Sequence, residues 1–412
     1  MSGLLISDKK IIKIIIIVSL IYMIPYTIDF VYLLTSRLYL ADLSFYKIKT
    51  ELTSVEIWFI FLRGIFYYFL GIFIFFIFQK KNYAVGYHIC IDRKKLEFVF
   101  ILFFALQIFF AFKFKIGAAG GHSANKFSTL MNLVSIESFF PIYYFLYRDK
   151  VTKKYLFVIF LYCVLKVVQG WSGFILSLFF MEVFYRIYKG KLGIYFILLI
   201  PVVILCGGFV YKIFYPIKIY FRTGKNESIT YLESLVKLVT RLSCFSNSCA
   251  AYEFRENMFK FNSILSREHA EILYYFNAFV PSFVYDKSFA PLNQTLLLAV
   301  FNGRGGISNF DLGSTYYYLL FKLSIFDYIL YFSLFIVSAI IYRLLLEFIV
   351  PSKKSIASIL IIYMNNNLTL LNGSGLNTQS GWFFLIISIG FLYFLGILKI
   401  YKEKRVMYGN SN

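Results

Sequence analysis

Residues 57–78 read IWFIFLRGIFYYFLGIFIFFIF, an unbroken apolar run in which Arg63 is the single charged residue. An α-helix rises about 1.5 Å per residue, so this run spans roughly 33 Å, close to the hydrocarbon thickness of a bilayer. Over the 412 residues of the chain, 60% are hydrophobic and 15% are charged, whereas about a quarter of a soluble domain is charged. The sequence therefore predicts an integral membrane protein made of α-helices.

Ten apolar runs are long enough to cross a membrane, seven before a long polar stretch and three after it. They cover approximately residues 14–34, 57–78, 96–112, 127–147, 155–168, 171–188, 192–210, 326–346, 356–371 and 382–400. The fifth and sixth runs are separated by Gln169-Gly-Trp-Ser-Gly173 and are predicted to form a tight helical hairpin. Residues 295–301 are also apolar and able to re-enter the membrane, which leaves the number of spans open by one.

Lysine and arginine clusters mark alternate connections between these runs. They comprise Lys9, Lys10, Lys13, Lys80, Lys81, Arg93, Lys94, Lys95, Arg148, Lys150, Lys153, Lys154, Lys189, Lys191, Lys353, Lys354, Lys402, Lys404 and Arg405. Cytoplasmic connections carry such an excess, so both termini are predicted to be cytoplasmic and residues 212–315 to lie outside. The outer stretch contributes only +3 of the net charge of +21, with 11 Lys and Arg against 8 Asp and Glu. Membrane orientation thus explains the charge, and no nucleic-acid partner is expected.

The chain is expected to fold as three parts. Residues 1–211 form an N-terminal bundle of about seven spans, residues 212–315 an outer loop with short amphipathic helices, and residues 316–412 a C-terminal bundle of about three spans with a cytoplasmic tail. A loop of about a hundred residues is long for a mere connection, so chemistry is expected there. Asp29 and Arg63, within the spans, each need a polar partner or an aqueous cavity.

Two helices are predicted within the outer loop. Residues 229–245 carry apolar side chains at three- and four-residue spacing, and Thr230-Tyr-Leu-Glu233 has the form of a capping box. This helix either lies in the outer membrane interface, with Arg241 at headgroup level, or packs on a small core of the loop itself. A second helix is predicted to begin at Ser266 and to end before Pro281.

Several loop residues have side chains suited to acid–base or phosphate chemistry. His269 falls in the first turn of the second helix, where the helix dipole favours the neutral imidazole that a general base needs; it is also explained as a polar surface residue. Arginine binds phosphate oxygens in a bidentate way. The sequence has no recognisable nucleotide-binding loop, zinc site or serine triad, so no metal or cofactor is expected, and Cys244 and Cys249 are expected to be free thiols.

Two segments of the chain resemble the O-antigen polymerases, which are Wzy-type oligosaccharide repeat-unit polymerases. One is Phe279-Val-Pro281 followed by Asp286-Lys287, and the other is Asp311-Leu-Gly-Ser-Thr-Tyr-Tyr-Tyr318 at the start of the next span. The hairpin around Gln169-Gly-Trp-Ser-Gly173 is similar as well, so the resemblance covers roughly residues 155–340. The chain departs from the family in two places: Trp171-Ser-Gly-Phe174 lacks an arginine, and Ser282 stands where arginine is frequent.

The resemblance implies a glycosyltransferase of lipopolysaccharide biosynthesis in the bacterial inner membrane, with the large loop in the periplasm. It would transfer a growing polysaccharide from undecaprenyl pyrophosphate to the next lipid-linked repeat unit, without a cofactor. A base would deprotonate the acceptor hydroxyl, and cationic side chains would hold the pyrophosphate. The candidate bases are His269, Glu233, Glu253 and Asp286, and the candidate pyrophosphate or substrate ligands are Arg222, Arg241, Arg304 and Lys287. Its partners would be the lipid-linked oligosaccharides, membrane lipid, a flippase and a chain-length regulator.

Three other classes of membrane protein compete with this interpretation. A flippase for lipid-linked oligosaccharides has similar length and composition, although transporters usually carry internal repeats and none is evident here. The ligase that transfers finished glycan to a lipid A core shares the architecture. A membrane acyltransferase is disfavoured because no histidine lies in or beside an early span.

Overall fold

The computed structural model describes residues 8–79, 87–114, 136–171, 173–189, 191, 200–224, 227–265, 269–276, 290–306, 310–348 and 381–402, and these are mostly helical. The α-helices are α1 (Asp8–Ser36), α2 (Ser54–Gln79), α3 (Arg93–Phe114), α5 (Phe140–Tyr147), α6 (Lys153–Val168), α7 (Gly173–Tyr188), α8 (Ile200–Thr223), α9 (Tyr231–Leu242), α10 (Phe245–Glu253), α11 (Arg255–Leu265), α12 (Ala270–Phe276), α13 (Leu296–Val300), α14 (Gly313–Leu323), α15 (Ile325–Phe348) and α17 (Gly381–Phe394). Short 3-10 helices are η1 (Ala41–Tyr46), η2 (Ile136–Phe139) and η4 (Leu292–Gln294), and the strands are β1 (Tyr87–Ile91) and β2 (Leu398–Lys402).

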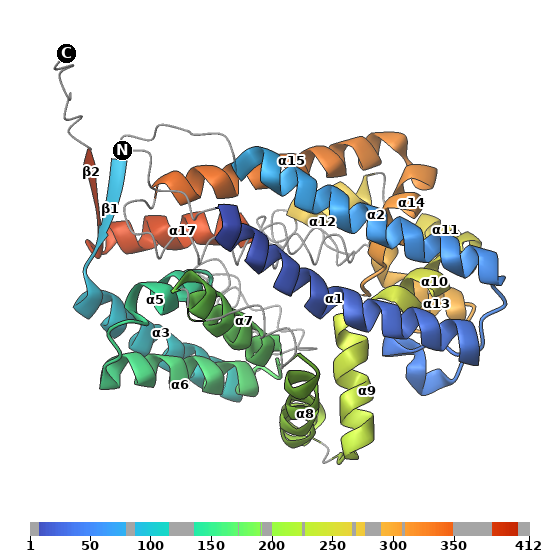
Figure 1. The fold of residues 1–412 in the computed structure, drawn as a ribbon, viewed down its shortest axis with the longest axis horizontal. Coiled ribbons are helices and arrows are strands. Elements are labelled where there is room, and N and C mark those ends of the chain that lie inside the picture. Colours follow the sequence, from blue (N-terminus) through green and yellow to red (C-terminus); the bar gives the residue numbers. More distant parts are fainter. Residues whose placement is uncertain are drawn as a thin grey trace.

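The long helices run along the length of the molecule. In Figure 1, α1, α2 and α15 follow the long axis, with the two strands near one end and α10, α11, α13 and α14 gathered at the other. Helix α9 runs across this axis and lies beside α8. Loop helices α10, α11 and α13 are thus packed at one end of the long helices, and α9 packs against α8 and α1.

Most predicted apolar runs that fall on described residues are helices. Helices α1, α2, α3, α6, α7 and α15 match their predicted runs closely. Helix α8 continues to Thr223, beyond the predicted end at 210, because Pro216 is accommodated inside it. The predicted run at 356–371 lies outside the described residues, as do residues 127–135 of the run at 127–147. The rest of that run forms η2 and α5.

The break predicted at residues 169–173 is confirmed, because α6 ends at Val168, Gly170 has a φ of 72°, and α7 begins at Gly173. The two helices on either side of the break pack on different neighbours. Helix α6 lies against α3 and α8, and α7 lies against α1 and α5.

The prediction of an all-α protein is wrong at the strand end of the molecule. Strands β1 and β2 pair in antiparallel register, from Tyr87 opposite Lys402 to Ile91 opposite Leu398. The last predicted span, 382–400, ends early at Phe394, and Gly396 turns the chain with a φ of 65°. Glycine adopts this left-handed conformation without a Cβ clash, so the apolar residues after it leave the helix and form β2.

Two hydrophobic clusters organise the interior. One joins α3, α5, α6, α7 and α17, with Phe140 stacked on Tyr162 at 3.9 Å between ring centroids. The other joins α1 and α2 to η1, α10, η4, α13 and α14, with Phe30 stacked on Phe61 at 4.2 Å and Phe245 edge-on to both. Stacked and edge-to-face rings are favourable arrangements for aromatic pairs. The second cluster therefore fixes the loop helices against α1 and α2.

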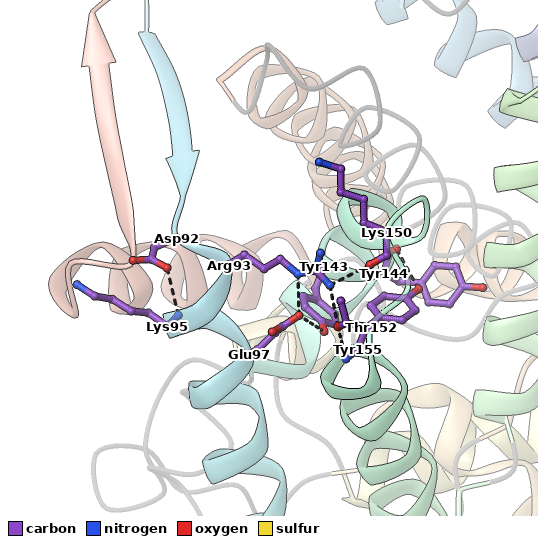
Figure 2. Close-up of polar contacts among 9 residues, drawn as sticks. All are labelled: Asp92, Arg93, Lys95, Glu97, Tyr143, Tyr144, Lys150, Thr152 and Tyr155. Atoms are coloured by element: carbon purple, nitrogen blue, oxygen red, sulfur yellow. Dashed lines mark hydrogen bonds and ion pairs between the residues drawn. The ribbon is translucent and has the colours of Figure 1, made fainter.

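A polar network braces α3, α5 and α6 near the strands (Figure 2). Arg93 Nε lies 2.8 Å from Glu97 Oε1, and the Tyr143 hydroxyl donates to the same oxygen at 3.4 Å. Arg93 Nη2 donates to the Lys150 carbonyl and to Thr152 Oγ1, each at 3.0 Å, and Thr152 caps α6. These groups satisfy one another, so we assign the network a structural role.

Candidate active site

The segment Gly313–Tyr318, which opens α14, is the hub of the candidate site. Gly313 has a φ of 56°, and a Cβ added to it would lie 2.2 Å from Ser248 Oγ. Ser248 in turn donates to the Leu312 carbonyl at 2.7 Å. Only glycine permits both this conformation and this close approach of α14 to α10. Of the residues that follow Gly313, Ser314 and Thr315 both accept from Arg63, and Tyr316 donates to Glu271.

His269 and Asp327 form a hydrogen-bonded pair between α12 and α15. His269 immediately precedes α12, and its carbonyl accepts from the amides of Ile272 and Leu273 at 3.1 and 2.9 Å. Its Nδ1 lies 2.6 Å from Asp327 Oδ1; the imidazole is 49% exposed and the carboxylate only 5%. A proton on Nδ1 donates to this carboxylate and leaves Nε2 as an acceptor, the arrangement of a general base oriented by an acid.

Glu271 lies two residues after His269 and is buried between α12, η4 and α14. One carboxylate oxygen accepts from the amide of Leu292 and the other from the hydroxyl of Tyr316. Burial raises the pKa of Glu271 to about 7; the charge of Asp327 adds to the increase, and the two hydrogen bonds oppose it. Desolvation disfavours the charged form of a carboxyl. The group therefore changes its charge near neutral pH, beside the His269–Asp327 pair.

Arg63 of α2 reaches the start of α14 from the other side. Its Nε donates to Ser314 Oγ at 3.3 Å, and its Nη2 donates to Thr315 Oγ1. Three rings surround the guanidinium, with centroids 5.0 to 5.8 Å from its carbon: those of Tyr318, Phe59 and Tyr252. The described neighbours of this cation are thus hydroxyl groups and aromatic faces.

Asp29 of α1 is fully buried and satisfied by the segment that leads into α10. Ser243 Oγ donates to Oδ2 at 2.8 Å, and the Ser246 amide donates to the same oxygen at 3.0 Å. The Ser246 hydroxyl donates to Oδ1 at 2.5 Å. Asp29 therefore anchors the loop to α1.

Glu233 forms the predicted capping box. Its Oε2 accepts from the Thr230 amide at 2.8 Å, and its own amide donates to Thr230 Oγ1 at 3.2 Å. The hydrogen bond from the Thr230 amide is the main cause that lowers the pKa of this exposed carboxyl. The helix it starts, α9, is shorter than the predicted 229–245. Its apolar face packs on α8, where Leu238 and Leu235 approach Gly207 and Gly208.

Glu253 ties α10 to the connection between α1 and α2. Its Oε2 accepts from the hydroxyls of Tyr39 and Thr50, each at 2.5 Å. Its Oε1 accepts from the Glu51 amide at 3.3 Å. Because three donors hold both oxygens, this carboxylate is suited to a structural role.

Each remaining predicted residue either is located only by the element or turn that carries it, or lies outside the described residues. Arg222 lies near the end of α8 and Arg241 in the last turn of α9. Arg304 is exposed in the turn after α13. Asp286 and Lys287 lie outside the described residues. Of the eight residues chosen from the sequence, His269 alone is described in contact with the groups assembled at α14 and α15.

The sequence analysis did not select Asp327, Glu271 or Tyr316 as site residues. Asp327 carried a signal, since Ser324-Ile-Phe-Asp327 begins an apolar run in the form of a helix cap, and the Asp327 amide does donate to Ser324 Oγ at 3.2 Å. Glu271 and Tyr316 are 45 residues apart, and nothing in the sequence links them. Cys244 and Cys249 are free, as predicted.

No protein family, curated protein or solved structure matches the chain. Within the described residues, no three or more His, Cys, Asp or Glu side chains are grouped to hold a metal ion. The function is therefore inferred from the geometry of the site and from the resemblance of the sequence segments.

Proposed function

We propose that this protein is an O-antigen polymerase: a polytopic glycosyltransferase that joins oligosaccharide repeat units at the outer face of the bacterial inner membrane. The growing chain is carried on undecaprenyl pyrophosphate, which departs when the acceptor sugar attacks. The family resemblance supplies the reaction. The pairing of His269 with Asp327 is the observation that carries the proposal.

The outward faces of the long helices support a membrane location; the number of about ten spans is taken from the sequence. By length and composition, Ser54–Gly71 and Arg93–Phe114 are able to cross a membrane, and Ile325–Leu334 and Phe383–Phe394 are shorter apolar helices. Only 33% and 39% of the two longer windows are buried, which is low for helices in a soluble core. Large exposed side chains follow one face of α2 at three- and four-residue spacing: Trp58, Leu62, Phe66, Phe69 and Phe73. A contiguous stripe of this kind suits contact with lipid.

The His269–Asp327 pair supplies the base. Asp327 keeps the proton on Nδ1, so Nε2 accepts the proton of the acceptor hydroxyl. The acceptor oxygen then forms a bond to the anomeric carbon of the donor glycan. The bond from that carbon to the pyrophosphate oxygen breaks, and the electron pair leaves with the lipid pyrophosphate. A positioned base accelerates such a step by about 10²–10⁴-fold.

Deletion of the gene tests the proposal. Surface polysaccharide from the deletion strain should collapse from a ladder to a single repeat unit on a gel, and the plasmid-borne gene should restore the ladder. Loss of all glycan from the core would instead indicate a ligase or a flippase. An unchanged ladder would contradict all three.

A flippase is the second candidate. Arg63 and Asp29 lie within helices that we place in the membrane, and transporters use ionisable groups at that depth. A flippase has no use for a base. Loss of function on substitution of His269, with lipid-linked repeat units still reaching the outer face, therefore favours the polymerase.

A further inference from the structure

Arg63 is a cation without a counter-charge among the described residues. It lies in α2, one of the two described helices that are long and apolar enough to cross a membrane, and none of the ion pairs formed within the described part of the chain includes it. Its hydrogen-bond partners, Ser314 and Thr315, are neutral. Arg63 is half-buried, and a charge withdrawn from water without a charged partner is costly; in a membrane helix it usually marks a functional site.

Two buried donors, one on this guanidinium and one beside it, lack hydrogen-bond partners among the described residues. One is Arg63 Nη1 and the other is the hydroxyl of Tyr26, a residue only 5% exposed. The Tyr26 hydroxyl packs against the backbone next to Arg63, because a Cβ on Gly64 would lie 1.9 Å from it. Buried polar groups are nearly always hydrogen-bonded. Two unpaired donors at one place therefore indicate that an acceptor binds there.

We propose that Arg63 and Tyr26 form a binding site for the diphosphate group of the lipid carrier. This inference rests on the proposed function and names the residues that hold its leaving group. Phosphate oxygens accept from Arg63 Nη1 and from the Tyr26 hydroxyl, and they supply the missing negative charge. The amino end of α14, which carries Ser314 and Thr315, adds a favourable dipole.

The surroundings of the site suit a diphosphate attached to an isoprenoid rather than a free anion. Phe59 forms one wall around the guanidinium and is itself exposed, next to exposed Leu62 on the lipid-facing stripe of α2. An apolar chain can therefore continue from the site along that stripe. Arg304, a sequence-based candidate for the same role, is exposed in a turn and has no side-chain partner among the described residues.

Binding to the purified full-length protein tests this site directly. Farnesyl diphosphate and inorganic pyrophosphate serve as the two probes, with affinity measured by thermal stabilisation in detergent. Arg63→Gln should weaken binding of farnesyl diphosphate by roughly tenfold or more, as expected for loss of a charge-assisted hydrogen bond. Tyr26→Phe keeps the ring and should weaken binding by a smaller factor. Lys322→Gln, an exposed cation at the other end of α14, is the matched control and should bind as wild type.

The outcomes separate this inference from the proposed function. No binding of either probe by wild-type protein, or equal binding by Arg63→Gln and wild type, overturns the site. Tighter binding of inorganic pyrophosphate than of farnesyl diphosphate overturns the lipid-carrier assignment and leaves a free-phosphate site. Arg63-dependent binding of farnesyl diphosphate together with an unchanged polysaccharide ladder in the deletion strain supports the site and refutes the polymerase.

Discussion

Asp327→Asn should abolish most of the activity without unfolding the protein. Asparagine has nearly the same shape as aspartate, so the packing of α12 against α15 is retained. It lacks the negative charge that holds the proton on His269 Nδ1 across the 2.6 Å contact. An imidazole protonated on Nε2 instead cannot accept the acceptor proton.

The size of the loss follows from the role of the base. General-base catalysis contributes about 10²–10⁴-fold, or roughly 3–5 kcal/mol of transition-state stabilisation. Asp327→Asn should therefore reduce the rate of polymerisation by at least about a hundredfold, and His269→Ala by a similar factor. The two losses should not add, because both variants remove the same function.

The assay is the incorporation of repeat units by purified protein, with unfolding temperature measured in parallel. Glu256→Gln is the control, because Glu256 is an exposed acid paired with Arg255 at 3.5 Å. A second measurement tests whether Asp327 is charged and close to Glu271: since the charge of Asp327 contributes to the raised pKa of Glu271, Asp327→Asn should lower the pKa of Glu271. Near-normal activity of a folded Asp327→Asn protein would refute the dyad.

Three further predictions concern other parts of the molecule. Gly313→Ala should lower the free energy of unfolding by about 1–3 kcal/mol, because the new Cβ meets Ser248 Oγ and α14 begins at a positive φ; thermal unfolding measures this. The pKa of Glu271 is about 7 in the folded protein, compared with an ordinary value of 4.5. At pH values between these two, the folded state binds the proton more tightly than the unfolded state. Stability should therefore fall by up to about 3 kcal/mol as pH rises through that window, and Glu271→Gln should flatten the dependence in denaturant titrations. A reporter fused after Asp286 should be external and one fused after Lys154 cytoplasmic; the reverse result contradicts the orientation.

The features that local sequence determines were predicted well. Long apolar runs indicated α1, α2, α3 and α15 because a helix satisfies its own backbone hydrogen bonds in any apolar surrounding. The capping box at Thr230 and Glu233 was recognisable because both partners lie within one turn.

The candidate site was predicted only in part because its contacts join distant segments. Asp327 is 58 residues from His269, and Thr315 is 252 residues from Arg63. No periodicity connects residues so far apart. The pairing of β1 with β2 was not predicted for the same reason. The tyrosines after Gly313 were noticed as a motif, but their separate partners depend on the packing of α14. Glu233 was chosen as a candidate base, and the structure shows its carboxylate in the capping box of α9.

Reconstitution tests the central claim most directly. Full-length protein in liposomes, supplied only with undecaprenyl-pyrophosphate-linked repeat units, should produce a ladder of polymers and release undecaprenyl pyrophosphate. The His269→Ala protein, folded and inserted to the same extent, should leave single units. Single units from the wild-type protein, or equal ladders from both proteins, would contradict a polymerase that uses His269 and Asp327 as its base.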